Sequence, residues 1–474
     1  MNRMTTKNGH CPQWDVKLSR GAGSPLYVQL ADAVERAIET GALVSGDRLP
    51  PHHNLARDLD VNITTITKAF SVLKEKGLVD SRPGRGTIVR PQQNDAEVQF
   101  QTAASESGSV IDLSVNRPAS SAYTTHLSKL LPALPQDERF PSLKDYQNPE
   151  GPVWARDAGV QWISEFGPPV ERERVLVTDG AQHALACTLS AVTSVGDCVL
   201  ADNVTYQGIN ALCRAQHLEL RGVAGDAQGM SPEALEAACR EHSPKVLFLV
   251  PNLHNPTTIT LSEERRRQLL EVVQRHDLLI VEDDVYAPLL DSPPPAFAAM
   301  DPERTVYFTG LSKCVAPGLR AAFVVPPARL VPDVAAAIRI DCWSVAPLTC
   351  LVATRMIEDG TAREIVETHR SELKQRNEIA RQILPGDELR TQPTSTHAWL
   401  ELPESWRGVS FADVCQYHGV RVLASEAFTL GQAAAPHAVR INVAAARSQE
   451  DLEKALIIVQ NLLLRGHLHL NNAI

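Results

Sequence analysis

The architecture of most of this chain can be read from the segment Thr309-Gly310-Leu311-Ser312-Lys313-Cys314-Val315-Ala316-Pro317-Gly318-Leu319-Arg320. Lys313 follows the apolar run 306–308 among small residues, and Arg320 lies seven positions further along the chain. A lysine whose pKa is lowered by its surroundings can form a Schiff base with an aldehyde. The planar guanidinium of an arginine is well suited to holding a phosphate. Together the two residues indicate a site for pyridoxal phosphate (PLP).

Other residues that such a cofactor needs stand after further strand-like runs. Asp283 ends the run 279–283, and a carboxylate there lies at the sheet edge where α/β folds bind ligands. It would keep the pyridine nitrogen of PLP protonated, so that the ring withdraws electrons. Tyr286 and Asn255 are expected to hydrogen-bond the 3′ oxygen of the ring.

The phosphate and the substrate also have candidate partners. Gly180-Ala181-Gln182 follows a strand and opens a helix, so its backbone amides can cradle phosphate. Tyr206 follows the next strand, where its ring can stack on the cofactor. Arg440 lies in the apolar run 438–443, where a partly buried cation needs an anion, and a substrate carboxylate is one candidate.

Each of these residues also has an ordinary structural interpretation. Asp283 can cap a helix, Asn255-Pro256 can be a simple turn, and Arg440 can pair with an internal carboxylate. For any one residue the ordinary interpretation is favoured, but the ordered set favours the cofactor site.

The region from Val110 onward alternates strand-like and helical stretches, which is typical of an α/β fold. The strand-like runs are nearly all apolar, as expected for strands covered on both faces. They are 174–177, 198–201, 246–250, 278–281, 306–308 and 321–325. Helices are expected at 232–242 and from Ser262, which has helix-start character. After about residue 350 a long polar helix (361–383) and short strands predict a smaller C-terminal α+β subdomain.

The N-terminal region, residues 20–90, predicts a mainly helical domain. Helical apolar spacing over 25–40, a second helix near 49–59 and a third over 63–76 are separated by short turns. Two helices joined by a tight turn are typical of a helix-turn-helix, and 81–89 reads as a hairpin, or wing. The alternative is a small helical domain with no role in DNA binding. Ten Lys and Arg against eight Asp and Glu make 20–90 mildly basic.

Composition limits the remaining possibilities. The chain has 474 residues and a net charge of −10, which argues against general nucleic-acid binding but not against a segregated basic face. Residues 91–109 are polar and read as a linker. We find no signal peptide and no membrane-spanning run, so no membrane partner is expected. Nine unpatterned cysteines favour reduced thiols in the cytoplasm over disulfides or a zinc site, and no metal is expected.

The stretch GDRLPPHHNLARDLDVNITTITKAFSVLKEKGLVDSRPGRGTIV (46–89) resembles the winged helix-turn-helix of GntR-type bacterial regulators. The resemblance implies binding to double-stranded operator DNA. The base contacts that it implies come from Thr64, Thr65, Thr67 and Lys68. The phosphate contacts that it implies come from Arg57, Arg82 and Arg85. His53 and Ile63 stand where this family usually or often carries arginine, which should weaken backbone affinity or change the operator.

Residues 110–465 resemble the fold-type I PLP-dependent aminotransferases. Glycine loop, aromatic, Asn-Pro, Asp-x-x-Tyr, Ser312-Lys313, Arg320 and distal Arg440 occur in that family's order. The resemblance adds Tyr146, whose family equivalent reaches the phosphate of the neighbouring subunit. Two departures, Gly310 for Ser or Thr and Thr258 for the glycine of an Asn-Pro-Thr-Gly turn, suggest an altered phosphate grip.

The combination resembles the MocR subfamily of GntR-type regulators, which implies a homodimer with PLP sites at the interface. It further implies that Lys313 holds PLP and that an amine or amino acid effector displaces it as an external aldimine, with Arg440 holding its acid group. Two alternatives remain open. The protein can be a working aminotransferase, or it can sense PLP itself and control vitamin B6 metabolism.

Overall fold

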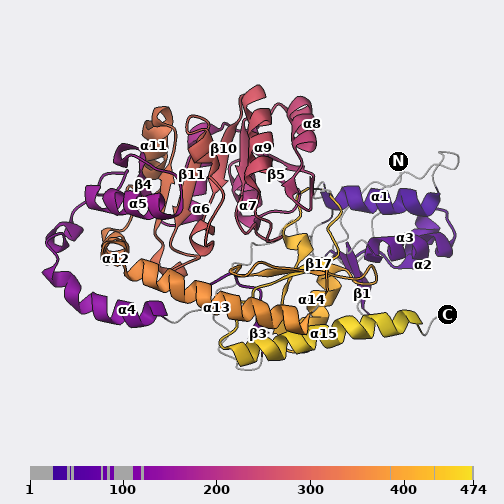
Figure 1. Cartoon of the computed structure of the whole chain (residues 1–474). Helices are drawn as coiled ribbons and strands as arrows, with labels where there is room; N and C mark the ends of the chain where they lie inside the picture. Colours follow the sequence, from indigo (N-terminus) through magenta and orange to yellow (C-terminus); the bar gives the residue numbers. More distant parts are fainter. Residues whose placement is uncertain are drawn as a thin grey trace. The chain divides into compact units, whose positions relative to one another are not determined.

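The computed structural model describes residues 25–39, 43, 47–75, 78–82, 86–89, 110–118, 122–384, 386–431 and 433–471 (Figure 1). The chain forms two compact units, 1–99 and 100–474, which are treated separately. The expected linker at 91–109 and the turn of the expected wing, 83–85, lie outside the described residues. No described helix is both long enough and apolar enough to cross a membrane.

The N-terminal unit has three helices followed by a strand pair. The helices are α1 (Leu26–Glu39), α2 (His52–Asp58) and α3 (Ile63–Glu75), and strands β1 (Val79–Arg82) and β2 (Gly86–Val89) pair antiparallel. Helix α3 begins after Asn62 because the Asn62 Oδ1 accepts a hydrogen bond from the Thr64 N–H at 2.9 Å. The apolar faces of the helices and strands share one core, with Leu30, Leu55 and Ile66 fully buried.

The C-terminal unit is built on a seven-stranded sheet with the order β4-β12-β11-β10-β9-β5-β6. Strand β12 runs antiparallel to the other six strands, which are parallel to one another. The strands are β4 (Leu176–Thr178), β5 (Cys198–Asp202), β6 (Glu219–Val223), β9 (Val246–Leu249), β10 (Leu279–Asp283), β11 (Thr305–Gly310) and β12 (Ala322–Val325). All six expected strand-like runs are therefore strands, and β6 is an addition at the edge.

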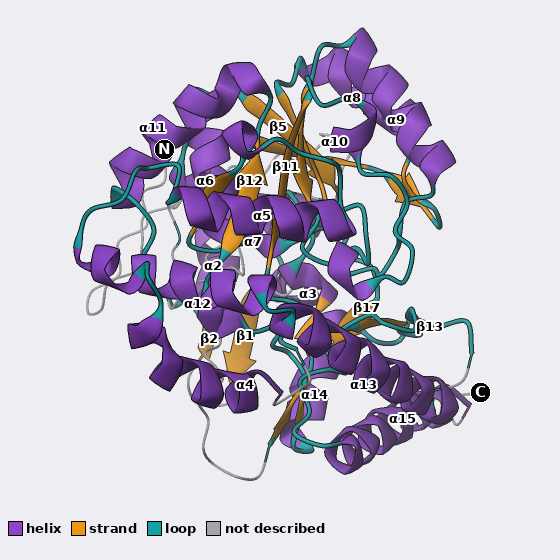
Figure 2. Cartoon of the chain, turned by 60° about the vertical axis from the view of Figure 1, so that its left-hand side comes forward, coloured by secondary structure: helices purple, strands orange, loops and turns teal. Residues whose placement is uncertain are grey.

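Helices cover both faces of this sheet (Figure 2). Alternate residues of β5 enter different cores: Val199 packs with helix α6 (Ala181–Val192), and Leu200 packs with α8 (Pro232–His242) and α9 (Glu263–Arg275). This two-sided burial explains why the strands read as continuous apolar runs. The remaining helices of this part are α4 (Ala122–Leu130), α5 (Val153–Phe166), α7 (Gln207–Ala215), α10 (Phe297–Met300), α11 (Val331–Cys342) and α12 (Pro347–Glu358).

A second, antiparallel sheet lies in the C-terminal part, with the order β13-β14-β17-β16. Its strands are β13 (Leu389–Arg390), β14 (Ala398–Glu401), β16 (Leu423–Ala424) and β17 (Ala438–Ile441). The helices α13 (Thr361–Ile383), α14 (Gly408–Tyr417) and α15 (Gln449–Asn471) share its core. The early strand β3 (Ile111–Asp112) pairs with β15 (Val420–Arg421), so residues near 111 join this part. From the sequence, only residues from about 350 onward were expected there.

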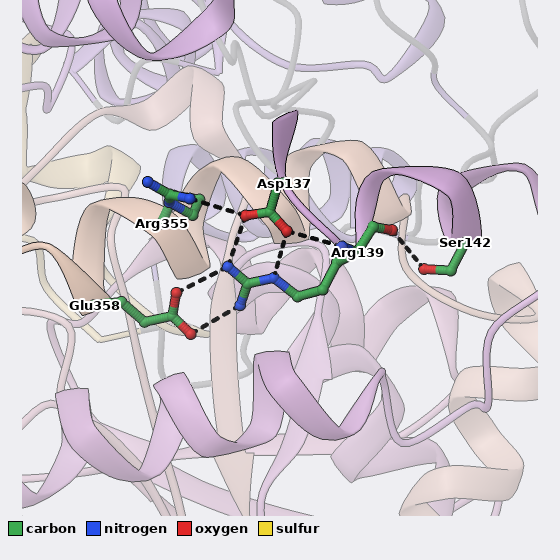
Figure 3. A network of polar contacts seen from close by, with 5 residues as sticks. All are labelled: Asp137, Arg139, Ser142, Arg355 and Glu358. Atoms are coloured by element: carbon green, nitrogen blue, oxygen red, sulfur yellow. Dashed lines mark hydrogen bonds and ion pairs between the residues drawn. The ribbon is translucent and has the colours of Figure 1, made fainter. Parts of the chain in front are cut away.

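A polar network holds the segment after α4 against α12 (Figure 3). The guanidinium of Arg139 donates to both carboxylate oxygens of Asp137 and to both of Glu358, at 2.8–2.9 Å. Arg355 donates to Asp137 at 3.0 Å. Hydrogen bonding from Arg139 lowers the pKa of Asp137, a side chain that is only 2% exposed. The network therefore joins residues more than 200 positions apart.

Replacing Asp137 by alanine should lower the free energy of unfolding by about 3 kcal/mol, because it leaves two guanidinium groups without their buried carboxylate. Urea unfolding followed by tryptophan fluorescence measures this loss, since Arg139 also lies 5.6 Å from the centre of the Trp154 ring. The matched control is Asp145→Ala, whose exposed pair with Lys144 should contribute less than about 1 kcal/mol. Equal losses in the two variants would show that the network does not stabilise the fold.

Candidate cofactor site

A cavity of about 380 Å³ lies at the carboxyl edge of the seven-stranded sheet. Nine residues that the sequence marked as cofactor-binding line it: Ala181, Gln182, Tyr206, Asn255, Asp283, Tyr286, Ser312, Lys313 and Arg320. They come together because each follows or ends a strand, and the carboxyl ends of parallel strands meet at one edge. The structure thus gathers residues spread over 140 positions into one enclosure.

Lys313 follows β11 and is the amine of the cavity. Its Nζ donates a hydrogen bond to the backbone carbonyl of Asn116 at 2.9 Å. Burial, together with the nearby Arg440 and Arg320, lowers the pKa of Lys313 to about 8, while Asp283 acts in the opposite direction. A larger fraction of the amine is therefore in the neutral, nucleophilic form than in an ordinary lysine.

Asp283 ends β10 and faces the cavity with Tyr286. Burial raises the pKa of Asp283 to about 7, although the Val285 N–H and Lys313 favour the charged form. A carboxylate in this position is suited to accept a hydrogen bond from the protonated ring nitrogen of a pyridine. The Tyr286 hydroxyl accepts a hydrogen bond from Asn116 Nδ2 at 2.7 Å, and burial raises the pKa of this tyrosine.

The opposite end of the cavity has the groups that hold a phosphate. Helix α6 begins after Gly180, whose φ of +85° favours glycine, and a Cβ there would lie 2.6 Å from Arg320 Nη2. Arg320 also donates to the Asp179 carbonyl at 2.7 Å, and this bond fixes its guanidinium beside the helix N-terminus. The buried Ser312 Oγ lines the same cavity and has no hydrogen-bond partner among the residues that the structure describes. Free helix amides, a hydroxyl and a guanidinium are the donors that bind phosphate.

The two departures from the family pattern have a structural setting. A Cβ at Gly310 would lie 2.9 Å from Ala322 Cβ on the neighbouring strand, so a serine there would force the strands apart. Ser312 is the hydroxyl that reaches the cavity instead. Thr258 has a φ of +64°, a conformation in which glycine is the usual residue, and its N–H donates to the His254 carbonyl.

Arg440 lies on β17, behind Asn255. Its Nη1 donates to Asn255 Oδ1 at 2.8 Å and its Nη2 to the Ser114 carbonyl at 2.5 Å, while Nε has no hydrogen-bond partner in the described part of the chain. The side chain is 4% exposed, more deeply buried than the sequence indicated, and burial lowers the pKa of Arg440 to about 10. No carboxylate among the described residues forms an ion pair with it. A buried cation in this state favours an anionic ligand.

Two further residues contact the groups of the cavity: Tyr206, which lines it, and Asn116, which was not expected from the sequence and hydrogen-bonds to lining residues. Tyr206 donates from its hydroxyl to Gln182 Oε1 at 2.9 Å. Asn116 bonds to Lys313 and Tyr286, and its Oδ1 accepts from Thr396 Oγ1 at 2.9 Å and Asn442 Nδ2 at 3.1 Å. Asn116 escaped notice because it lies in a short segment without a motif, 197 positions before Lys313.

Tyr146 lies away from the cavity. Its side chain is 89% exposed, and its ring centre is 5.8 Å from that of Trp343, which is 55% exposed. The structure therefore does not bring Tyr146 to the cofactor cavity of its own subunit.

The expected base-contacting residues of α3 lie mostly on its open side. Thr64, Thr67 and Lys68 are exposed, and Thr65 is half-buried. Asn62 Oδ1 accepts the Thr64 hydroxyl at 2.9 Å. The hydroxyl of Thr67 donates to the Ile63 carbonyl at 3.0 Å, so it is already engaged within the helix.

The expected phosphate-contacting arginines are described only in part. Arg57 is exposed at the end of α2 and lies 3.1 Å from Asp58. The side chain of Arg82 and the whole of Arg85 lie outside the described residues. His53 and Ile63, which replace arginines of the family pattern, are both exposed.

The lowered pKa of Lys313 predicts its reactivity. Because only the neutral amine is nucleophilic, labelling of Lys313 by an amine-reactive reagent should be half-maximal near pH 8. An ordinary exposed lysine should reach that point near about pH 10.4. Peptide mass spectrometry of cofactor-free protein labelled at a series of pH values measures both. A midpoint for Lys313 as high as that of exposed lysines would contradict the effect of burial.

Both compact units match known protein families. Residues 26–89 match the family model for bacterial regulatory proteins of the gntR family, and residues 108–458 match aminotransferase class I and II. The HTH-type transcriptional regulator YdeF of Bacillus subtilis, itself uncharacterized, is 32% identical over 93% of this chain and 95% of its own length. The HTH-type transcriptional regulator NorG of Staphylococcus aureus is 24% identical over 71% of this chain and 81% of its own.

Solved structures show the fold of the larger unit. An archaeal alanine:glyoxylate aminotransferase superposes with a TM-score of 0.70 at 22% identity, covering 75% of this chain and 91% of that one. The fold and the cavity define a DNA-binding regulator that carries an aminotransferase-like domain. The chain belongs to the GntR-type transcriptional regulators with a class I and II aminotransferase domain, consistent with the MocR subfamily. This family and fold imply PLP as the cofactor, and the residues of the cavity fit it.

Proposed function

We propose that the aminotransferase-like domain senses a small amino compound and thereby controls how the N-terminal domain binds operator DNA. The observation that carries this proposal is Arg440, a buried guanidinium without a carboxylate partner among the described residues, joined through Asn255 to the cavity of Lys313. An amino acid supplies both an amine for the cofactor end and a carboxylate for Arg440. The ligand can control DNA binding only if it binds one arrangement of the protein's domains better than another.

When bound, PLP supplies an aldehyde that condenses with primary amines and a ring that withdraws electrons. In this proposal Lys313 holds the cofactor covalently, and Asp283 keeps the ring nitrogen protonated. Gly180, Ala181, Gln182, Ser312 and Arg320 hold the phosphate. Tyr206 packs on the ring, while Tyr286 and Asn255 hydrogen-bond its oxygen.

The domain limits of the proposal are 20–90 for the DNA-binding domain, 91–109 for the linker and 110–465 for the effector domain. A regulator acts where its DNA is, so the proposal places the protein in the cytoplasm. A homodimer is part of it, because several large apolar side chains of the effector domain are exposed. They include Tyr146, Trp343, Ile340, Leu348 and Val153. Sedimentation of the purified protein measures the subunit number.

The second candidate function is an aminotransferase. It is favoured by the complete set of groups around Lys313 and by the Lys313 pKa of about 8. The two functions differ in what they predict: an enzyme turns over amino acids with 2-oxo acids, whereas a sensor binds its amino compound and changes its affinity for DNA.

The DNA side of the proposal is tested on α3. Replacing Lys68 by alanine should weaken binding to the upstream DNA of the gene about tenfold or more, since one good base contact contributes about 1–3 kcal/mol of discrimination. Fluorescence anisotropy with labelled duplex measures the affinity. Lys74→Ala, an exposed lysine in the last turn of the same helix, is the matched control, because the N-terminal part of a recognition helix reads bases. Equal effects of the two variants would rule out that the N-terminal part of α3 is the part that contacts the bases.

A further inference from the structure

A second cavity, of about 320 Å³, lies beside the cofactor cavity and shares Val250 with it. Asp202 at the end of β5 and His254 in the loop after β9 line one side. Arg390 and Glu401 of the smaller sheet line another. Its volume lies in the range of small-molecule sites. No residue of this cavity has a role in the function proposed above.

Asp202 and His254 are the unusual pair in its wall. His254 is 5% exposed, and its Nδ1 is 2.8 Å from Thr257 Oγ1. Its Nε2 has no hydrogen-bond partner among the described residues and lies 3.6 Å from an Asp202 carboxylate oxygen, beyond hydrogen-bond distance. Burial raises the pKa of Asp202 to about 7 and lowers the pKa of His254 to about 4. The pair is therefore a desolvated carboxyl beside a neutral imidazole.

The other charges of this cavity are already compensated. Arg390 pairs with Glu401 at 2.5 Å, and Asp226 pairs with Arg265 at 2.9 Å. In the described part of the chain, Asp202 forms no ion pair with a lysine or an arginine. The carboxylate of Asp202 is consequently the charge without a counter-ion in this cavity, and this favours a cationic ligand over an anionic one.

The loop that carries His254 connects the two cavities. His254 and Thr257 line the second cavity, whereas the intervening Asn255 lines the cofactor cavity and accepts from Arg440. The loop is held from the smaller sheet's side by Gln392, which donates to the Thr258 carbonyl at 2.7 Å. A molecule in the second cavity would thus contact His254, which is next in the chain to Asn255, the residue that accepts a hydrogen bond from Arg440.

We propose that the second cavity binds a small protonated amine, whose ammonium group lies between the carboxylate of Asp202 and the imidazole of His254. This site is separate from the one for the amino compound that reaches Lys313, because Lys313 lines only the first cavity. The inference does not depend on the proposed regulatory function, since it concerns binding alone.

The test uses N,N-dimethylethanolamine and the full-length protein loaded with PLP. The free base of this tertiary amine carries no N–H, so it cannot condense with an aldehyde and does not react in the cofactor cavity. Isothermal titration calorimetry should detect binding to the wild type and binding about 30-fold or more weaker to Asp202→Asn, which removes the charge but keeps the shape. Glu271→Gln, an exposed carboxylate on α9, should bind like the wild type.

A wild type that does not bind this amine would overturn the proposal, and so would an Asp202→Asn variant that binds it equally well. If Asp202→Asn fails to fold, Ala434→Trp decides the question. Ala434 is an exposed residue of the cavity wall, so an indole introduced there should reduce the space in the cavity while leaving Asp202 and His254 themselves unchanged. Loss of binding in Ala434→Trp supports the site, and unchanged binding contradicts it.

Discussion

Lys313→Ala should abolish the covalent attachment of PLP. No other lysine lines the cofactor cavity in the described part of the chain, and the Lys313 amine is the one whose pKa falls to about 8. Borohydride reduction followed by intact-mass measurement should add one cofactor mass to each wild-type chain and none to the variant. Arg320, Ser312 and the N-terminus of α6 remain, so the variant should still bind PLP without the covalent link.

The control for this experiment is Lys454→Ala, which removes an exposed lysine from α15. It should retain the full mass increase and the visible absorbance of the wild type. A mass increase in Lys313→Ala equal to that of Lys454→Ala would show that another amine holds the cofactor, and the site described above would then be wrong.

Arg440→Ala should weaken the binding of an amino acid effector about 30-fold or more, because it removes the buried partner of the ligand's carboxylate. Titration of the visible cofactor band with the amino acid that shifts it most measures the affinity. The decarboxylated amine of the same compound is the matched probe. The wild type should prefer the amino acid, whereas Arg440→Ala should bind the two with similar affinity.

Arg440→Lys refines the assignment. It keeps the charge but loses the planar fork, so its preference for the amino acid should lie between those of the wild type and Arg440→Ala. If Arg440→Ala keeps its cofactor band and still prefers the amino acid as strongly as the wild type, then Arg440 does not hold the ligand carboxylate.

The sheet was largely predictable from the sequence because its strands are buried on two sides. Val199 and Leu200 enter different cores, so β5 reads as an unbroken apolar run. Strand β6 was missed for the opposite reason. It lies at the edge with a single neighbour, and its residues 219–222 are exposed or half-buried, so Glu219-Leu220-Arg221-Gly222 carries no strand signal.

The cofactor cavity was predictable where residues follow strands, and much less so elsewhere. Asp283 ends a strand, and Lys313 and Asn255 follow shortly after one, so the carboxyl edge of the sheet brings all three to the cavity. Asn116 comes from a segment before the sheet and reaches Lys313 only through tertiary packing. Only partial burial of Arg440 was anticipated from its apolar neighbours, and its hydrogen bond to Asn255 depends on how the smaller sheet meets the loop after β9.

The central claim is that a ligand in the cofactor cavity changes DNA affinity. The most direct measurement is the dissociation constant for labelled upstream DNA, with and without the amino acid that shifts the cofactor band, in the wild type and in Lys313→Ala. We expect a change of about fivefold or more in the wild type, typical of allosteric coupling, and no change in the variant. A wild-type affinity that stays the same when the cofactor band has fully shifted would contradict it.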